Sequence, residues 1–264
     1  MVSATDPCAD TVTPRAAAQI LEHIGEAYVA VDANWRFTYV NAPAERIYRQ
    51  SREVVLGNNF WQMFPTAHGT EFEREYRRVM AEREEGMVEG PFPRLGAWFC
   101  VKIYPLDNGG LAFYFSDVTQ QRCAEMHLAC QKRVQELIFA EAALHEILNV
   151  LARAVENVAV NPVLVSIHVL DAEGQLRHTA APSLPDTFND AVDCIPVGPD
   201  TVPCAAAAYA GQALFVENIA EHPNACFRHL AFAHELSACW SIPIVSPQGA
   251  LLPFRLKFRG RPHG

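Results

Sequence analysis

The stretch from Gln120 to Val155 contains neither proline nor glycine and is rich in alanine, glutamate, leucine and glutamine. These residues have high helix propensity, so the sequence predicts one long helix over 120–155. The chain has 264 residues, half of them hydrophobic, which is enough for an ordinary domain on each side of such a helix. We therefore expect a flexible leader over 1–14, a first domain over 15–119, the connecting helix, and a second domain over 156–264.

Five runs of β-branched and aromatic residues mark strands in the first domain. The first two are separated by Asp32-Ala33-Asn34 and the last two by Asn108-Gly109-Gly110, both typical of hairpin turns. Between the second and third runs, Asn41 caps one expected helix and Glu71–Glu85 forms another. The order strand, strand, helices, three strands predicts an α+β domain with an antiparallel sheet. The expected strands are 27–32, 35–40, 87–93, 98–105 and 111–116.

Three segments of this domain carry a family resemblance: Val31 to Asn41, Leu56-Gly57-Asn58-Asn59-Phe60, and the strands that close on Asp117-Val118-Thr119. The last motif, followed at once by a helix, is the most specific. Together the segments resemble a PAS domain over about residues 15–120. The resemblance implies a five-stranded sheet whose helices enclose a small cavity, often used to hold a ligand or cofactor.

Seven side chains are candidates for lining that cavity: Val31, Phe60, Trp61, Phe64, Phe99, Val101 and Phe113. The alternative is that they form only a packed core, and both interpretations stay open. The light-sensing flavin branch of the family needs a cysteine where this chain has Asn59-Phe60-Trp61, which argues against photochemical flavin binding. The cofactor is unknown, with non-covalent flavin and haem left open. Haem needs an axial ligand, and His68 lies in a polar, loop-like setting.

The connecting helix carries an apolar heptad repeat. Such a stripe is buried either on the chain's own domains or against the same helix of a second copy. We expect a parallel homodimer through 120–155, in which a ligand event in the first domain alters the register of the two helices. Cys123 and Cys130 then either form an intersubunit disulfide or act as small apolar fillers. The seam consists of Val134, Leu137, Leu144, Leu148 and Leu151.

The second domain opens on a hairpin, with Val163–Leu170 and Gln175–Ala180 as its strands. A short small-residue helix from Cys204 to Tyr209 and a strand over 213–216 follow. A helix over 227–236 and a strand over 238–245 complete the pattern. These elements predict a second antiparallel α+β domain.

Two segments of this domain, 195–223 and 230–252, resemble a GAF domain of bacterial signalling proteins, of the type that follows a PAS domain and precedes a kinase or cyclic-dinucleotide module. The most distinctive part is Ala238 to Ile244. Pro203-Cys204-Ala205 stands where the family usually has a glycine pair. The segment 253–264 is either a final strand with alternating Phe254, Leu256 and Phe258 or an accidental tail, so the domain is atypical or truncated at its C-terminus.

Eight cysteines without a CxxC pair predict free thiols in a reducing compartment, and no spacing predicts a metal site. Cys194, Cys204 and Cys226 are candidate redox residues. They carry one alternative function, because free methionine-(R)-sulfoxide reductases are GAF-like thiol enzymes. A bilin-binding photoreceptor fragment is another alternative, because PAS followed by GAF is also the phytochrome order and Cys8 lies upstream.

The formal net charge of −9 gives no general attraction to nucleic acid or to anionic membranes. No apolar stretch approaches the roughly 20 residues of a membrane span, and residues 1–14 do not resemble a signal peptide, so we expect a cytoplasmic protein. No Walker A loop, GGDEF or EAL string, or kinase glycine box is present in the sequence. The sequence thus predicts a non-enzymatic sensory module, without catalytic residues, that senses a small ligand or a redox state and passes the signal to a partner protein in two-component or cyclic-di-GMP signalling.

Overall fold

The computed structural model describes residues 19, 21–22, 25–245 and 251–259. The chain divides into two compact units, Met1–Thr119 and Gln120–Gly264. The predicted leader over 1–14 lies outside the described residues, as does Cys8.

The first unit is built on a five-stranded antiparallel sheet with the strand order β2-β1-β5-β4-β3. The hairpins β1–β2 and β4–β5 are those that the turn residues predict. Gly110 closes the second hairpin because a Cβ at this position would lie 2.0 Å from the carbonyl oxygen of Val31. The strands are β1 (Ala27–Val31), β2 (Phe37–Val40), β3 (Gly86–Phe92), β4 (Ala97–Pro105) and β5 (Leu111–Asp117).

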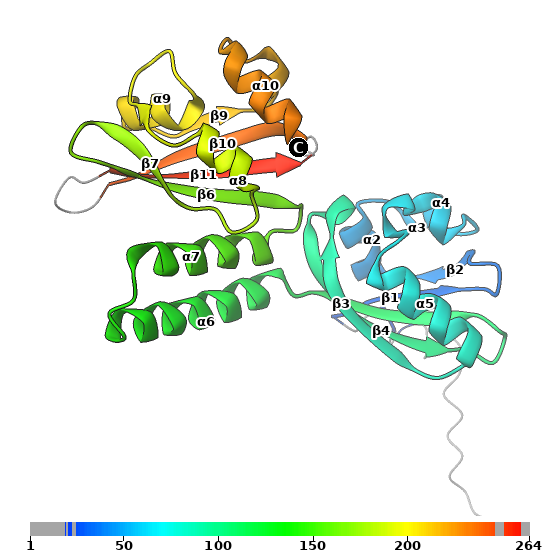
Figure 1. Ribbon diagram of the computed structural model, residues 1–264. Coiled ribbons are helices and arrows are strands. Elements are labelled where there is room, and N and C mark those ends of the chain that lie inside the picture. The colour runs from blue at the N-terminus through cyan, green and yellow to red at the C-terminus, as the bar shows by residue number, and fades with distance from the viewer. Residues whose placement is uncertain (1–18, 20, 23–24, 246–250, 260–264) are drawn as a thin grey trace, which may run out of the picture. The chain divides into compact units, whose positions relative to one another are not determined.

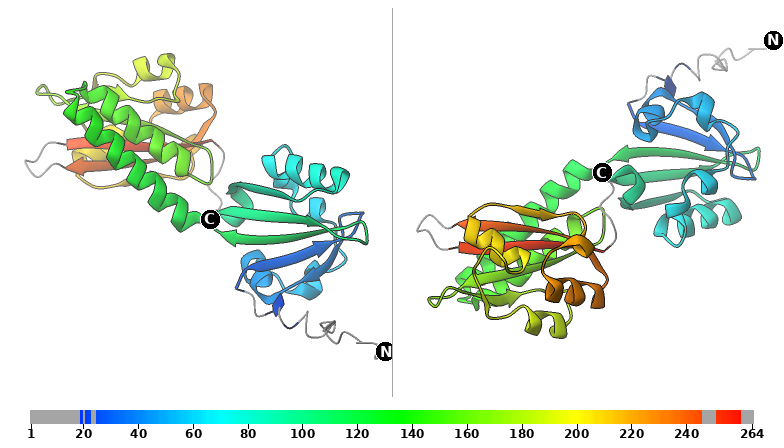
Figure 2. Two further views of the ribbon diagram at one scale, coloured as in Figure 1. Left: turned by 90° about the horizontal axis from the view of Figure 1, so that it is seen from below. Right: turned by 90° about the horizontal axis from the view of Figure 1, so that it is seen from above.

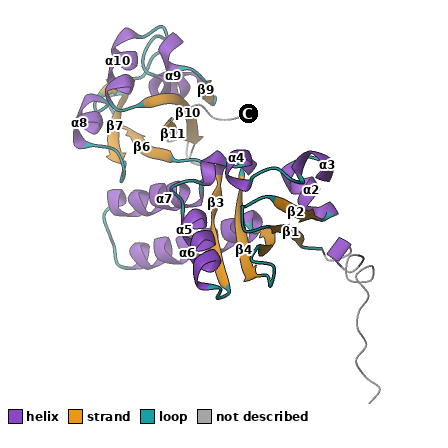
Figure 3. Cartoon of the chain, turned by 90° about the vertical axis from the view of Figure 1, so that its right-hand side faces the viewer, coloured by secondary structure: helices purple, strands orange, loops and turns teal. Residues whose placement is uncertain are grey.

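The helices of this unit lie on one face of the sheet (Figures 1 and 3). Polar side chains cap the N-termini of two of these helices. Asn59 Oδ1 accepts the N–H of Trp61 at 3.0 Å, and the Thr70 hydroxyl oxygen accepts the N–H of Glu73 in the next helix. The charged helix ends at Glu82, three residues before the predicted end, because Arg83 adopts the left-handed conformation (φ 60°). The helices are α2 (Ala42–Tyr48), α3 (Arg52–Val55), α4 (Phe60–Met63) and α5 (Glu71–Glu82), with 3₁₀ turns at Pro65–Ala67 and Pro93–Leu95.

The core of the first unit lies between this helical layer and the sheet. It is built largely from aromatic rings, among them Phe37, Phe72 and Phe113, each no more than 2% exposed. The opposite face of the sheet carries a smaller cluster centred on Tyr28, Ala30 and Ala112.

A long helix follows β5, as predicted, but it ends at Phe139. The stretch 120–155 forms two helices, α6 (Thr119–Phe139) and α7 (Leu144–Val158), which run antiparallel side by side (Figures 1 and 2). Glu141 has a φ of 53°, Glu141 N donates to Ile138 O, and Ala142 N donates to Leu137 O. This is a Schellman motif, and it usually has glycine at the left-handed position. The prediction of one continuous helix is wrong here because a glutamate, which favours helix, holds that position.

The second unit has a six-stranded antiparallel sheet with the strand order β8-β7-β6-β11-β10-β9. The strand β11 pairs with β6 on one side and β10 on the other. Of the two interpretations of segment 253–264, the structure therefore supports a final strand, and this strand lies inside the sheet. The strands are β6 (Val163–Leu170), β7 (Gln175–Ala180), β8 (Ile195–Pro196), β9 (Leu214–Val216), β10 (Leu236–Val245) and β11 (Leu251–Arg259).

Helix α7 covers one face of this sheet, and the shorter helices cover the other (Figure 1). Leu148 and Ala152 of α7 pack against Val163 and Val165. On the other face are α8 (Asp186–Ala191), α9 (Pro203–Ala210) and α10 (Ala225–Ala233), with a 3₁₀ turn at Ile219–Glu221. The sequence predicted no helix at α8, and α10 ends before the predicted Leu236 because Leu236 already belongs to β10.

Two antiparallel α+β domains joined by a long helix are thus the architecture of the chain. Among the residues that the structure describes, no helix combines the length and the apolar character needed to cross a membrane.

Candidate functional site

A small cavity lies in the core of the first unit, between the sheet and the helices α2, α4 and α5. Its volume is about 30 Å³. That is room for about two water molecules, since one water needs roughly 10–15 Å³ by the same measure. The cavity is lined by Val29, Tyr48, Phe60, Phe64, Phe72, Tyr76, Phe92, Leu95, Phe99, Val101, Phe113 and Phe115.

The aromatic rings around the cavity contact one another mainly edge to face. The rings of Phe72 and Phe92 lie 5.5 Å apart at 76°, and those of Phe99 and Phe115 lie 6.0 Å apart at 69°. Tyr48 instead stacks on Phe115 at 5.5 Å and 18°. Edge-to-face pairs are favourable because the positive ring edge meets the negative ring face, so this lining holds its own shape.

Two tyrosines give the cavity its only polar side-chain atoms. Tyr76 is 4% exposed, and Tyr48 is half-buried. Neither hydroxyl forms a hydrogen bond with the part of the chain that the structure describes. Burial raises the pKa of Tyr48, and burial, with a smaller contribution from Tyr48, raises the pKa of Tyr76 well above its usual value. Both phenols are therefore protonated at neutral pH and are available as hydrogen-bond donors.

Five of the seven predicted cavity residues line this space: Phe60, Phe64, Phe99, Val101 and Phe113. Val31 is fully buried in the same core without lining the cavity. Trp61 does not line it either. Its indole stacks on the His68 ring, with ring centroids 5.1 Å apart, and lies under the guanidinium of Arg77.

The sequence reasoning missed both tyrosines. For Tyr76, the available signal was its helical spacing from Phe72 within the predicted helix Glu71–Glu85. Tyr48 is the last residue of α2, and only the fold shows which way it faces. The two tyrosines matter because the aromatic residues that were predicted are purely apolar.

Haem and flavin fit this cavity poorly. His68 Nδ1 lies 3.0 Å from Glu73 Oε1, where the carboxylate accepts its hydrogen bond, and His68 does not line the cavity. None of the lining residues is a histidine, cysteine or methionine, so the lining offers no soft or imidazole ligand to a haem iron. A volume of about 30 Å³ is also far smaller than either ring system, so the aromatic rings would have to rearrange.

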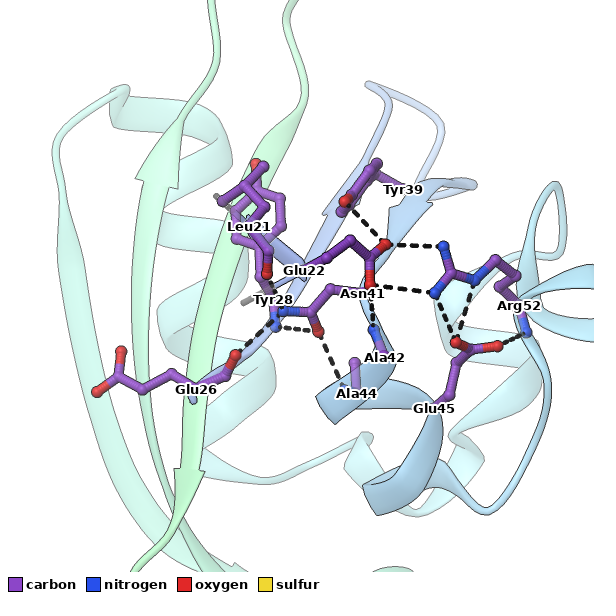
Figure 4. Close-up of polar contacts among 10 residues, drawn as sticks. All are labelled: Leu21, Glu22, Glu26, Tyr28, Tyr39, Asn41, Ala42, Ala44, Glu45 and Arg52. Carbon is purple, nitrogen blue, oxygen red and sulfur yellow. Dashed lines mark hydrogen bonds and ion pairs between the residues drawn. The ribbon is translucent and has the colours of Figure 1, made fainter. Parts of the chain in front are cut away.

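Asn41 fastens the N-terminal end of the first unit to its sheet (Figure 4). Its side chain is fully buried, and Oδ1 accepts the N–H groups of Tyr28 at 2.9 Å and Ala44 at 3.0 Å. Its Nδ2 donates to the carbonyl oxygens of Leu21 at 2.9 Å and Glu26 at 3.1 Å. One amide thus caps α2 and ties the segment before β1 to the fold.

Arg52 adds an ionic clamp to the same region (Figure 4). Its guanidinium contacts Glu22 at 2.8 Å and Glu45 at 2.7 Å, and the hydroxyl of Tyr39 also donates to Glu22. The hydrogen bonds from Arg52 are the largest cause that lowers the pKa of Glu22 and of Glu45. Both carboxylates therefore stay ionised at neutral pH, and residues before β1 are held against α2 and α3.

The C-terminal end of the first unit is fastened by Thr119. The hydroxyl oxygen of Thr119 accepts the N–H of Trp98 at 2.8 Å, and Trp98 O accepts Val118 N at 2.9 Å. Asp117 Oδ1 accepts the N–H of Thr119 at 2.9 Å. The Asp117-Val118-Thr119 motif therefore ties the start of α6 to β4, one residue away from Phe99 of the cavity.

In the second unit, an apolar groove of about 470 Å³ lies between α6, α7 and one face of the sheet. The wall on α6 consists of Cys123, Met126, His127 and Cys130. The predicted seam residues divide between the two helices. Val134 and Leu137 are half-buried on α6, whereas Leu144 (53% exposed) and Leu151 (37% exposed) lie on α7. Leu148 is turned toward the sheet and is 6% exposed, so it is not available to a seam with a second copy.

The candidate redox cysteines do not form a recognisable thiol site. Cys204 is fully buried, whereas Cys194 and Cys226 are exposed, and the described cysteines are all free thiols. The Cys194 thiol donates to Asp193 at 3.3 Å and contacts Arg177. The contact with Asp193 is the main cause that raises the pKa of Cys194, although an attacking thiol needs a lowered one. No group of three or more potential metal ligands occurs among the residues that the structure describes.

Comparisons with known proteins agree with this architecture. A family model described as a PAS fold matches residues 21–123, and one described as a GAF domain matches residues 141–252. The methyl sulfide methyltransferase-associated sensor of Methanosarcina acetivorans is 34% identical over 139 residues. The match covers 52% of this chain and 14% of that protein, so the chain spans about a seventh of the relative's length.

Comparison with solved structures finds similarities at low identity. The PAS domain of nitrogen regulation protein NR(II) from Vibrio parahaemolyticus is 13% identical, covering 38% of this chain and 96% of that one, with a TM-score of 0.32. The GAF domain of an Acinetobacter phosphoenolpyruvate-protein phosphotransferase is 14% identical, covering 52% and 78%, with a TM-score of 0.38. The fRMsr of Staphylococcus aureus in its reduced form is 16% identical, covering 52% and 81%, with a TM-score of 0.40.

Together the two family models and the sensor-named relative support a sensory module. In this chain it consists of a PAS domain followed by a GAF domain, as the sequence motifs predicted.

Proposed function

We propose that the PAS cavity binds a small ligand and that its occupancy is passed through β4 and Thr119 to the helices α6 and α7. The cavity is the observation that carries this proposal. It is enclosed by rings that support one another edge to face, and it contains hydroxyl groups that the described chain leaves without hydrogen-bond partners. A mostly apolar lining with a few polar groups is typical of ligand sites, although most such sites are larger than this cavity.

Few residues separate the cavity from the start of α6. Phe99 lines the cavity, and the backbone N–H of its neighbour Trp98 donates a hydrogen bond to the hydroxyl oxygen of Thr119. A ligand that shifts Phe99 therefore acts on the residue that starts α6. Because packed helices change between discrete arrangements, a shift at this start is expected to alter how α6 rests on α7.

The output of the module is proposed to be a protein contact at the α6–α7 hairpin. Helix α6 has no buried residue, and Leu128, Ile138 and Phe139 are more than half exposed. A second copy of the chain packed on this apolar surface would give a homodimer of helical hairpins, in place of the two-stranded coiled coil that the heptad pattern predicted. The downstream signalling partner and the cytoplasmic location stay predictions.

A non-enzymatic role is part of the proposal. The raised pKa of Cys194 and the burial of Cys204 disfavour the thiol-enzyme alternative, because sulfoxide chemistry requires an accessible thiolate next to a resolving thiol. The bilin alternative depended on Cys8, which lies outside the described residues.

Cavity filling tests the function. Val101→Leu adds bulk inside the cavity, whereas Val88→Leu, on the neighbouring strand and opposite Val101, adds the same bulk outside it. Xenon, which occupies small apolar cavities, serves as the probe, and the readout is hydrogen exchange of the first turns of α6 in the full chain. Xenon should change this exchange in the wild type and in Val88→Leu but not in Val101→Leu. Xenon that enters the cavity without any effect on α6 would disprove the relay.

A further inference from the structure

The most unusual feature of the PAS cavity is a pair of hydrogen-bond donors in an otherwise apolar wall. Tyr48 and Tyr76 contribute the only side-chain polar atoms among the lining residues, and neither hydroxyl bonds to the described part of the chain. A hydroxyl that makes no hydrogen bond within the protein adds nothing to the stability of the fold that phenylalanine, which fills the same volume, would not provide. The chain therefore keeps two donors that its own described residues do not use.

We propose that the ligand of this cavity is a small neutral molecule with one strong hydrogen-bond acceptor, such as a carbonyl oxygen, which receives hydrogen bonds from Tyr76 and Tyr48. This inference rests on the proposed function, because it specifies the ligand of the same site. Both tyrosines line this one cavity.

The lining favours a neutral ligand over an ion. It contains no acidic or basic side chain other than the two phenols, which stay protonated. An ion would lose its hydration without gaining a counter-charge. The nearest cation on the aromatic wall is Arg94, whose guanidinium carbon lies 5.3 Å from the Phe64 ring centroid, and this exposed residue does not line the cavity.

The ring geometry also disfavours a cationic ligand. A cation binds the face of an aromatic ring. Here contacts within the wall already occupy part of the ring faces: Tyr48 stacks on Phe115, Phe60 stacks on Phe113, and Phe72 meets Phe92 and Tyr76 edge to face. The lining offers aromatic rings, methyl groups and two hydroxyl donors to a ligand.

The size of the cavity limits the ligand to a few non-hydrogen atoms unless the rings move. A volume of about 30 Å³ is about one fifth of the roughly 150 Å³ engineered cavity that binds benzene. The half-buried residues Tyr48 and Leu95 are the lining residues in contact with solvent, so a ligand is expected to enter beside them.

Three probes of similar size separate the ligand chemistries. Acetone carries an acceptor, isobutene has the same shape without one, and tetramethylammonium is a cation. Binding to the full chain is followed by NMR shifts of the aromatic protons of the PAS core. We expect acetone to bind about 3- to 10-fold more tightly than isobutene, the range that one or two hydrogen bonds provide. Tetramethylammonium should not bind.

Matched variants assign the preference to the hydroxyls. Tyr76→Phe and Tyr48→Phe keep the rings and remove the donors, and each should weaken acetone binding by about 2- to 10-fold while leaving isobutene binding unchanged. Tyr104→Phe is the control, because Tyr104 is 38% exposed and does not line the cavity. The ligand-free stability of Tyr76→Phe should be equal to or above that of the wild type, whereas a purely structural hydroxyl would make it lower.

The outcomes separate this inference from the proposed function. Equal binding of acetone and isobutene, or an unchanged acetone affinity in both tyrosine variants, overturns the acceptor preference while the cavity remains a ligand site. Tight binding of tetramethylammonium overturns the neutral class. If neither xenon nor any of the three probes shifts the core resonances, the proposed function fails together with the inference.

Discussion

The hydroxyl oxygen of Thr119 accepts the backbone N–H of Trp98 at 2.8 Å, which fixes the first residue of α6 to strand β4. Thr119→Val keeps the shape and removes the acceptor. It should lower the free energy of unfolding of the PAS domain by about 1–3 kcal/mol, because it leaves the Trp98 N–H without this partner. It should also speed hydrogen exchange in the first turn of α6. Thr119→Ser keeps the acceptor and is the control; equal effects of the two changes would show that the hydroxyl is not the fastening group.

Asn41 makes hydrogen bonds with both ends of its amide, and this makes its replacements informative. Asn41→Ala removes the cap of α2 and leaves buried backbone groups unpaired, so it should cost about 2–4 kcal/mol in urea unfolding. Asn41→Asp keeps the acceptor but places a carboxylate against the carbonyl oxygens of Leu21 and Glu26, so it should be no less damaging at neutral pH. Its stability should recover in part on acidification as the new carboxyl group takes up a proton. An aspartate variant as stable as the wild type would contradict the role of Nδ2.

The ionic clamp predicts a pH dependence. The folded-state pKa values of Glu22 and Glu45 are below the ordinary value of 4.5. Their contribution to stability is therefore present above about pH 4.5 and is lost as the pH falls through the lowered folded values. Arg52→Gln should cost about 0.5–1 kcal/mol at pH 7 and low salt, a small amount because the three side chains are partly exposed. The difference from the wild type should shrink below pH 4.5 and in high salt; a difference that grows on acidification would reverse the assignment.

Replacing Glu141 with glycine should change the stability in opposite directions for a helical hairpin and for a continuous helix. Glu141 is left-handed in the hairpin, so Glu141→Gly should stabilise the GAF domain by about 0.5–1 kcal/mol. In a continuous helix the same change would destabilise by about 1 kcal/mol. Glu136→Gly, inside α6, is the control and should destabilise in both cases. Thermal unfolding of the full chain and of both variants is the measurement.

Much of the fold could be predicted because its signals are local. Turn residues placed the β1–β2 and β4–β5 hairpins, and the motif at Asp117-Val118-Thr119 marked the passage from sheet to helix. The break between α6 and α7 has no such signal. A glutamate occupies the left-handed position, and its energetic cost there is offset by helix packing that a sequence pattern does not contain.

The candidate site was predicted in its apolar part and missed in its polar part. Phe60, Phe64 and Phe113 have large aromatic side chains, and the sequence pattern marks them as core residues. Whether such a ring borders a cavity depends on how the neighbouring rings pack. The same packing decides the position of Trp61, whose ring stacks on His68 and does not line the cavity. The tyrosine hydroxyls become conspicuous only when the neighbouring atoms are known.

The reversal of the chain at Glu141 changes what kind of motion the connector can transmit. A continuous helix over 120–155 would be a rod of roughly 50 Å that carries a rotation from one end to the other. In the hairpin, the first turns of α6 and the last turns of α7 border the same groove, at Cys123 and Val158. In the relay proposed above, a push along the axis of α6 would become shear against α7, and the width of the groove would change with it.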